Sequence, residues 1–445
     1  MDIQRLKGFR DLLPDETPLW QRIEAAAREV FGRYGFEEVR LPLLEETALF
    51  CRSIGEATDI VEKEMYTFLD TGGTSVTLRP EGTASAVRSY LENGLHHSET
   101  KARHYYLGPM FRRERPQKGR LRQFHQIGAE CFGWAEPWAD ADVLCLLWDL
   151  FAALGLSERV RLEVNSLGCA DDRRGYVARL REHLTPRQEA LCENCRRRLQ
   201  SNPLRVLDCK SAHCRAATQD APSLEGSLCG DCAAHFDLVR SHLTAQGLPF
   251  AVNHRMVRGL DYYNRTTFEL LSGDLGAQNA VAAGGRYDGL VETLGGPPVP
   301  ALGFALGVER LALLLGTQAA PRAHPDAYLV HRGTGALEAA LLLRRGLARA
   351  GVRTEVDYEE RSFKAQLRSA NRSGARLALL LGEDEVAAET VAVKDLAEGT
   401  QETVGWDRAA SRVAELLASP PTPSAGRDPH PGAPHVQSEK SEGST

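Results

Sequence analysis

The chain has 445 residues, and its 60 acidic and 54 basic residues give a net charge of −6 with histidine neutral. This length suggests about three domains, and a composition of 42% hydrophobic and 26% charged residues is typical of a soluble globular protein. The mild negative charge excludes a protein that coats nucleic acid through bulk charge, but not one with a local basic patch.

The sequence gives no sign of a membrane segment or of a disulfide scaffold. Its apolar runs stay short of the ~18 residues that cross a bilayer, and its N-terminus carries charges where a signal peptide needs an apolar stretch. We therefore expect a cytoplasmic protein without membrane contact. Ten cysteines in a chain of this length predict reduced thiols.

The first third of the chain predicts helices and strands in alternation. An amphipathic helix follows Pro18, with Thr17 as its N-cap. The next expected elements, in chain order, are strands over 38–42 and 75–79, a long hairpin over 104–130, a helix over 139–154 and a strand over 160–164.

The character of the chain then changes. Residues 171–250 are rich in Arg, Asp and Cys and predict an inserted module. Beyond it we expect a strand over 266–270, a glycine turn at Gly284–Gly285 and an apolar helix over 308–315.

The C-terminal part follows a linker near 317–325. Strand–helix alternation predicts a separate α/β domain over 325–417. Its expected strands cover 327–330, 352–356 and 377–381. The last segment, 419–445, has six prolines and a single large aliphatic residue, which predicts a disordered tail.

The common nucleotide loops are absent from the sequence. It contains no G-x-x-x-x-G-K-[ST] or G-x-G-x-x-G loop and no G-x-S-x-G elbow. If the protein handles nucleotides, arginines on strands must hold the phosphates.

A basic hairpin supports that reading. Residues 101–125 carry eight Lys or Arg against one acid, although most charged runs are solvated loops. Arg112, however, follows the apolar stretch Gly108–Phe111, where an unpaired guanidinium would be costly. A phosphate matches its fork geometry, and the basic tip, 115–120, extends the charge towards a polyanion.

Several long segments of the chain together resemble one known family. They read FEEVRLPLL (36–44), GPMFRRER (108–115), RQFHQIGAE (122–130), RGLDYY (258–263), GGRYDGL (284–290) and ALGFALGVERL (301–311). They are similar to motifs 1, 2 and 3 and the two histidine signatures of the histidyl-tRNA synthetase family, a class II aminoacyl-tRNA synthetase family. The match runs from Lys7 to about Trp406.

The resemblance implies a fold and an assembly. The expected fold class is α+β, with an antiparallel-sheet catalytic domain over 1–318 that the insertion over 171–250 interrupts. The α/β domain over 325–417 would bind the anticodon. Motif 1 implies a homodimer.

The resemblance also implies a reaction. L-Histidine and ATP, with Mg²⁺ as its counter-ion, would form histidyl-adenylate and pyrophosphate, and the histidyl group would then pass to tRNA(His) with release of AMP. Such chemistry asks mainly for positioning and charge neutralisation. Arg112 and Arg258 are implied as catalytic residues on opposite sides of the α-phosphate, and Arg310 as the partner of the γ-phosphate.

The same resemblance implies a histidine pocket. The ammonium group would meet Glu81, Thr83 and Gln126. Imidazole presents two nitrogens, of which one would donate to Glu130 and the other would bond to Tyr263. Two further aromatic residues, Tyr262 and Tyr287, would line the pocket. Glu309 is open to a purely structural role.

The cysteines of the insertion suggest a metal. Cys192-x-x-Cys195 and Cys229-x-x-Cys232 form two knuckles, as a four-thiolate structural zinc site remote from catalysis requires. The spacing between them is longer than in the usual zinc ribbon, and free thiols are the alternative.

Two basic clusters leave RNA contacts open. Arg173, Arg174 and Arg196–Arg198 in the insertion suggest contact with the tRNA acceptor arm, or a solvated charged face. In the C-terminal domain, Arg361, Lys364, Arg368 and Arg372 are compatible with an RNA-facing helix end.

Two other functions compete with the enzyme. One is a non-catalytic, histidine-sensing regulatory paralogue of an ATP phosphoribosyltransferase. Such a paralogue typically lacks the C-terminal domain and has eroded signatures, whereas both are intact here. An RNA-binding structural protein would not explain the complete histidine pocket.

Overall fold

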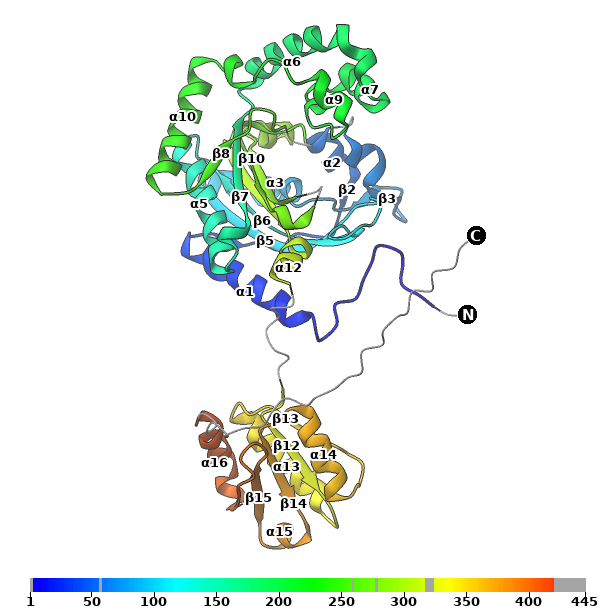
Figure 1. The fold of residues 1–445 in the computed structure, drawn as a ribbon, viewed down its shortest axis with the longest axis vertical. Helices are drawn as coiled ribbons and strands as arrows, with labels where there is room; N and C mark the ends of the chain where they lie inside the picture. The colour runs from blue at the N-terminus through cyan, green and yellow to red at the C-terminus, as the bar shows by residue number, and fades with distance from the viewer. Residues whose placement is uncertain (1–2, 56–57, 258–259, 277–278, 317–323, 420–445) are drawn as a thin grey trace, which may run out of the picture. The chain divides into compact units, whose positions relative to one another are not determined.

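The computed structural model describes residues 3–55, 58–257, 260–276, 279–316 and 324–419. The chain divides into two compact units, residues 1–321 and 322–445 (Figure 1). Among the described residues, no helix combines the length and the apolar character that a membrane span needs.

The first unit is built on an eight-stranded sheet with the order β1-β5-β6-β11-β10-β9-β7-β8 (Figure 1). The strands are β1 (Glu37–Glu38), β5 (Ala102–Phe111), β6 (Gln123–Phe132), β7 (Arg161–Ser166), β8 (Phe250–Val252), β9 (Asn264–Leu271), β10 (Ala280–Arg286) and β11 (Ala301–Gly307). All pairings from β5 across to β7 are antiparallel, and only the edge strands β1 and β8 pair in parallel. The antiparallel sheet that the family resemblance implies is therefore confirmed.

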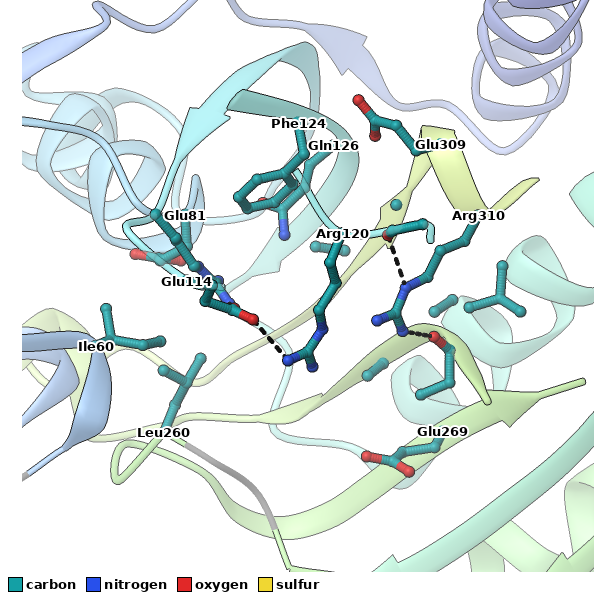
Figure 2. Close-up of a pocket in the computed structure, with 18 of the residues that line it drawn as sticks. Ile60, Glu81, Glu114, Arg120, Phe124, Gln126, Leu260, Glu269, Glu309 and Arg310 are labelled. Atoms are coloured by element: carbon teal, nitrogen blue, oxygen red, sulfur yellow. Dashed lines mark hydrogen bonds and ion pairs between the residues drawn. The ribbon is translucent and has the colours of Figure 1, made fainter. Parts of the chain in front are cut away.

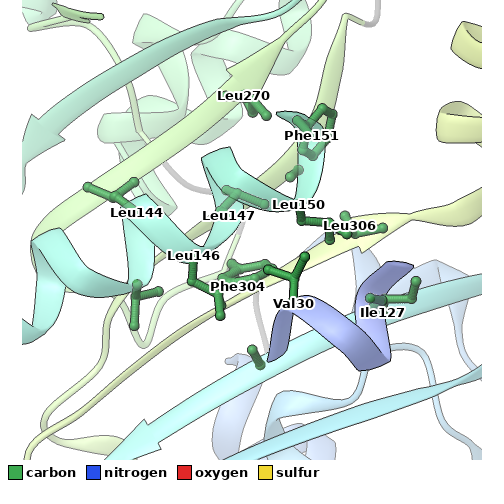
Figure 3. Packing of buried hydrophobic residues seen from close by; sticks show 14 of the residues in the cluster. Val30, Ile127, Leu144, Leu146, Leu147, Leu150, Phe151, Leu270, Phe304 and Leu306 are labelled. Atoms are coloured by element: carbon green, nitrogen blue, oxygen red, sulfur yellow. The ribbon is translucent and has the colours of Figure 1, made fainter. Parts of the chain in front are cut away.

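A large apolar core joins this sheet to its helices. It is formed with α1 (Thr17–Arg33), α5 (Pro137–Ala153), α10 (Gly230–Ala245) and α12 (Val308–Leu315). Figure 3 shows leucines of α5 packed against Val30 of α1 and Leu306 of β11. Helix α5 is apolar around most of its circumference, as expected of a helix that is buried on several sides. It packs against α1 and α10.

The rest of the first unit consists of short elements. A small antiparallel sheet has the order β2-β4-β3, with β2 (Leu44–Glu46), β3 (Tyr66–Leu69) and β4 (Ser75–Leu78). The helices beside it in sequence are α2 (Thr47–Ile54), α3 (Thr83–Glu92) and α4 (Leu95–Ser98). Helix α11 (Leu290–Thr293) is distant in sequence but contacts α2 and α3. Short π and 3₁₀ turns cover Ile60–Glu64, Ser157–Arg159 and Gly273–Leu275.

The segment predicted as an insertion is helical. It contains α6 (Ala170–Leu184), α7 (Glu193–Ser201), α8 (Leu204–Leu207), α9 (Ala212–Ala217) and α10, with 3₁₀ turns at Thr185–Ala190 and Glu225–Ser227. Its last helix, α10, buries Phe236, Val239 and Leu243 in the core with α5. This end of the segment thus packs as part of the main core.

The structure corrects three local expectations. The strand expected over 38–42 is limited to β1, Glu37–Glu38. The residue before the first turn of α1 is Glu16, and Thr17 is already helical. Gly284 and Gly285 lie inside β10 and not in a turn. A Cβ on Gly284 would lie 2.2 Å from the carbonyl oxygen of Gly303, so the missing side chain serves close packing between β10 and β11.

The second unit is an α/β domain, as predicted. Its five-stranded sheet has the order β13-β12-β14-β15-β16, with β12 (Ala327–His331), β13 (Thr354–Val356), β14 (Leu377–Leu381), β15 (Thr390–Asp395) and β16 (Gln401–Gly405). The helices are α13 (Ala336–Arg349), α14 (Phe363–Ser373), α15 (Glu383–Ala387) and α16 (Trp406–Ala418). The first three strands pair in parallel and confirm the prediction, whereas β15 and β16 were not foreseen. Residues 420–445 of the predicted tail lie outside the described residues.

A buried ion pair ties β10 to α5. Arg286 is fully buried, pairs with Asp140 of α5 and with Asp288 at 3.0 Å, and donates to the carbonyl oxygen of Trp134 at 2.8 Å. We expect Arg286→Met to lower the free energy of unfolding of the first unit by ~3–5 kcal/mol, because it leaves the buried Asp140 without its guanidinium partner.

Urea unfolding followed by tryptophan fluorescence measures this, since four of the five tryptophans lie in the first unit. Arg33→Met is the matched control, because Arg33 forms an exposed pair with Glu29, and such pairs contribute only ~0–1 kcal/mol. Equal effects of the two substitutions would contradict the assignment.

Candidate active site

A cavity of about 330 Å³ opens on the eight-stranded sheet between the hairpin β5–β6, the strands β9–β11 and the start of α12. Figure 2 shows it from close by. Seven of the predicted site residues line it: Glu81, Thr83, Arg112, Gln126, Tyr262, Tyr263 and Arg310. Residues that are distant in sequence thus meet here, as the family resemblance implies. Arg258 lies outside the described residues.

Arg112 follows the last residue of β5 and is held by the backbone. Its Nε donates to the carbonyl oxygen of Pro80 at 2.8 Å, and its guanidinium lies 5.3 Å from the ring centroid of Phe124. Its Nη1 is 3.9 Å from Glu114. These contacts fix the direction of the side chain before any ligand arrives.

Arg310 enters the cavity from the first turn of α12. Its Nε donates to the carbonyl oxygen of Gly119 at 3.5 Å, and its Nη1 donates to that of Ala280 (Figure 2). Burial lowers the pKa of Arg310, and the positive charges of Arg120 and Arg112 lower it further. The carboxylates of Glu114 and Glu269 act in the opposite direction. Three guanidinium groups thus share the cavity with carboxylates, and an anion bound beside the guanidinium groups would reduce the repulsion between them.

Arg120 is a cavity residue that the sequence did not single out as part of the site. It pairs with Glu114 at 2.6 Å, and both side chains line the cavity (Figure 2). In sequence it belongs to the basic hairpin tip, where nothing local separates an inward arginine from a solvated one. The sequence did not single out Phe124 either. Its position in a strand with alternating side chains does not distinguish a cavity residue from any other half-buried residue.

Glu81 lies at the start of α3 and is almost fully buried. Its carboxylate accepts from the backbone N–H groups of Thr83 at 2.7 Å and Ala84 at 2.9 Å. Burial raises the pKa of Glu81, although these two N–H groups and Arg112 act in the opposite direction. Each oxygen retains a second lone pair with which it can accept from a ligand.

Gln126 of β6 presents an unused acceptor. Its Oε1 is buried and has no hydrogen-bond partner among the described residues, and the side chain lines the cavity (Figure 2). A buried polar atom without a partner costs free energy. A ligand that brings an N–H donor to this position would recover that cost.

Glu130 and Tyr287 do not line the cavity in this structure but lie behind it. Glu130 is fully buried and accepts from Thr83 Oγ1 at 2.7 Å, from Tyr106 OH at 3.0 Å and from Tyr287 OH. Burial raises the pKa of Glu130 to about 8, against these hydrogen bonds. Thr83 connects this buried carboxyl to the cavity.

The tyrosines form one aromatic group. The ring of Tyr262 lies 4.6 Å from that of Tyr263 and 5.7 Å from that of Tyr287, measured between centroids. Tyr262 and Tyr263 line the cavity, with Tyr287 packed behind them.

Glu309 joins α12 to the hairpin. Its carboxylate accepts from the backbone N–H of His125 at 3.0 Å and lies 3.1 Å from that residue's Nδ1. This contact gives Glu309 the structural role that the sequence left open. The residue also lines the cavity, but its carboxylate points away from Arg120 and Arg310 (Figure 2).

The predicted four-cysteine set is wrong in its grouping. Cys192 and Cys195 lie with Cys209 and Cys214, whereas Cys229 and Cys232 lie with Cys169 and Asp172. In each group the potential ligand atoms all lie within 4.8 Å of one another. A C-x-x-C spacing identifies a knuckle, but the fold decides which residues complete it.

Family models match most of the chain. The model described as histidyl-tRNA synthetase matches residues 8–311, and the one described as anticodon binding domain matches residues 327–416. A protein of Geobacter metallireducens named histidine–tRNA ligase is 55% identical over 405 residues, which is 91% of this chain and 98% of that protein. One of Trichlorobacter lovleyi with the same name is 54% identical over 93% of this chain and 98% of that protein.

Solved structures agree with these matches. The apo histidyl-tRNA synthetase of S. aureus is 33% identical with a TM-score of 0.78, and the match covers 93% of this chain and all of that one. A Bacillus halodurans protein titled as an ATP phosphoribosyltransferase regulatory subunit/histidyl-tRNA synthetase has a TM-score of 0.63 at 20% identity. That likeness extends to the fold alone.

The buried Glu130 makes stability depend on pH. Its pKa of about 8 lies above the ordinary 4.5, so between these values the folded chain holds a proton that the unfolded chain has lost. The contribution of protonated Glu130 to the free energy of unfolding is complete below pH 4.5. It is lost as the pH rises towards 8, by at most ~1.4 kcal/mol per pH unit. We expect Glu130→Gln, which cannot ionise, to flatten this dependence.

The measurement is the free energy of unfolding of both proteins between pH 5 and 8.5. As the pH rises, the free energy of unfolding of the wild type should fall relative to that of Glu130→Gln. Glu182→Gln on the exposed face of α6 serves as the control, and its difference from the wild type should stay constant. Parallel curves for the wild type and Glu130→Gln would refute the assignment.

Proposed function

Because the chain belongs to the histidyl-tRNA synthetase family, it ligates histidine to tRNA with ATP, and we propose that the cavity residues carry this out by positioning and charge neutralisation. The observation that supports these roles best is the meeting of Arg112, Arg120 and Arg310 in one cavity with Glu81 and Gln126. The regulatory alternative is not favoured, since relatives at 50–55% identity are named histidine–tRNA ligase and both units are matched.

The first proposed step is attack of the histidine carboxylate on the α-phosphate of ATP, with departure of pyrophosphate. Arg112 would hold the α-phosphate, and Arg310 the γ-phosphate. Arg258 is proposed on the opposite side of the α-phosphate, from the family resemblance alone. Guanidinium groups fixed in place before the reaction stabilise developing phosphate charge without reorganisation.

The family uses ATP with Mg²⁺, and the cavity offers ligands that fit the ion. The carboxylates of Glu114 and Glu269 line it, and Mg²⁺ prefers oxygen ligands. When bound, the ion would neutralise part of the phosphate charge. The two carboxylates lie in the same cavity as the arginines. Arginines could therefore contact the triphosphate directly, and the carboxylates could contact it through the ion.

The proposed histidine site uses the acceptors beside the arginines. The ammonium group would donate to Glu81, Thr83 and Gln126, and the unpaired Oε1 of Gln126 supports this. For the imidazole, Tyr263 lines the cavity, whereas Glu130 lies behind Thr83. Direct contact between Glu130 and the ring therefore requires the Thr83 hydroxyl to release the carboxylate. Tyr262 and Tyr287 would form the aromatic wall.

Four further assignments complete the proposal. The tRNA would be tRNA(His), its anticodon bound by the second unit and its acceptor arm near the arginines of the insertion. A homodimer is proposed from the motif 1 resemblance, and Leu43 and Leu44 at the end of that motif are exposed. The location would be the cytoplasm, with the tRNA. Structural zinc in the insertion is the remaining proposed cofactor.

ATP–pyrophosphate exchange tests the adenylation step with each amino acid in turn. We expect exchange with histidine only, and a loss of ~10²–10³-fold in kcat for Arg112→Ala, because a fixed charge on the transition state is removed. Arg113→Ala is the matched control. Arg113 is the next residue in sequence, its side chain is exposed, and it does not line the cavity.

Two outcomes would contradict these roles. Exchange driven by another amino acid would refute the proposed substrate. Equal losses in Arg112→Ala and Arg113→Ala would show that the hairpin needs its total charge and not a particular guanidinium.

A basic stripe on α14 is proposed to contact tRNA. Lys364, Arg368 and Arg372 are exposed and four residues apart, so they share one face of the helix. We expect the double substitution Lys364→Ala with Arg368→Ala to raise KM for tRNA(His) and to reduce the salt dependence of its binding by about two phosphate contacts. Histidine-dependent exchange should be unchanged.

Arg345→Ala with Arg349→Ala on α13 is the control, because it removes the same charge from exposed positions of the same unit. If both double variants weaken tRNA binding equally, the stripe on α14 is a solvated face without a specific role.

A further inference from the structure

We propose that Cys192, Cys195, Cys209 and Cys214 bind one zinc ion through four thiolates. The proposal concerns the architecture of the insertion and does not depend on the ligase activity. It replaces the set expected from the two C-x-x-C motifs with one that the fold brings together.

The distances between the sulfur atoms fit a single ion. Tetrahedral coordination with Zn–S bonds of about 2.3 Å places the sulfurs about 3.8 Å apart. Here all four lie within 4.8 Å of one another, and Cys192 Sγ is 4.0 Å from Cys209 Sγ. Each sulfur is near all the other three, as ligands of one ion are, whereas two disulfides would join them in pairs.

The local structure presents the sulfurs as zinc knuckles do. Cys192 is the residue before the first turn of α7, and Cys195 lies in that turn. Cys209 follows α8, and Cys214 lies in α9. The spacing is therefore C-x₂-C followed by C-x₄-C, within the range of structural zinc sites. The backbone N–H of Cys192 also donates to Cys214 Sγ at 3.1 Å, which favours the thiolate form.

Burial differs among the four thiols. Cys195 and Cys214 are fully buried, as small hydrophobic cysteines often are. Cys192 and Cys209 are only half-buried, and both lie at the edge of the same hydrophobic cluster. A shared ion explains all four positions.

The surrounding charge suits such a centre. One zinc ion with four thiolates carries two net negative charges. Residues 187–215 contain seven Lys or Arg against three acids. Arg198 and Arg205 pair with Asp59, and Arg187 pairs with Asp220, so the remaining basic residues of the segment are the ones that can stabilise thiolates.

The second cysteine group differs chemically and provides an internal comparison. In that group Asp172 accepts from the backbone N–H groups of Cys169 at 3.2 Å and Cys229 at 2.9 Å. Its carboxylate thus caps the starts of α6 and α10 without an ion. A metal held there would have three sulfur ligands and one oxygen ligand, which spectroscopy distinguishes from four sulfurs.

The experiment uses the full chain purified under reducing conditions without chelator. We expect elemental analysis to find at least one equivalent of zinc. X-ray absorption should show four sulfur ligands around the ion that is lost in the variant Cys209→Ser. Cys209→Ser should contain one equivalent less than the wild type. Cys145→Ser is the matched control, because this α5 cysteine belongs to neither group, and it should retain the full amount.

A measurement on the wild type alone covers the case in which Cys209→Ser does not fold. The half-buried Cys192 and Cys209 should resist alkylation until zinc is removed by a chelator, and cobalt substitution should give the intense visible absorption of a tetrahedral thiolate complex. Absence of metal after incubation with zinc, iron in its place, a three-sulfur, one-oxygen shell at one equivalent, or zinc retained in Cys209→Ser would each overturn the proposal.

Discussion

Repulsion between guanidinium groups that share one cavity is the constraint on which the site depends. Arg112, Arg120 and Arg310 lie in the cavity together. Burial is the main cause that lowers the pKa of Arg310, and the charges of Arg120 and Arg112 lower it further. Glu114 and Glu269 act in the opposite direction. Carbonyl oxygens of the surrounding strands and loops hold Arg112 and Arg310 in place. In the proposed reaction a bound triphosphate would meet guanidinium groups that are already held in place, so little reorganisation would be needed.

Glycines allow the side chains of Tyr106 and Glu130 behind the cavity to lie close to the neighbouring backbone. A Cβ on Gly82 or Gly128 would lie 2.2–2.3 Å from the ring of Tyr106, and one on Gly303 would lie 1.9 Å from Glu130 Oε2. These positions leave room for a large ring and a carboxyl beside the strands. The hydrogen bonds from Thr83, Tyr106 and Tyr287 to Glu130 then fix the polar layer behind the cavity.

The sequence predicted the elements whose signals are local. Strand-like aromatic residues on both sides of a Gly/Pro/Gln loop predicted the β5–β6 hairpin, and mostly apolar runs predicted α5 and α12. Gly284–Gly285 was misread because a glycine pair signals a turn and a close strand contact equally well, and only the partner strand tells them apart. The cysteine pairing failed because spacing does not reveal tertiary neighbours. Most site residues came from the family resemblance, and Arg120 was missed because a loop arginine has no local mark of direction.

The structure also changes how the insertion relates to catalysis. Cys195, Cys214 and Leu199 belong to the same hydrophobic cluster as Tyr263 and Tyr287. A metal remote from catalysis was the expectation, yet close-packed interiors transmit small displacements along such a cluster. An ion bound to the cysteines would touch no reacting group. It would instead hold α7 and α9 together within the hydrophobic cluster to which Tyr263 and Tyr287 also belong. The packing of the insertion and the packing behind the proposed histidine pocket therefore share one cluster.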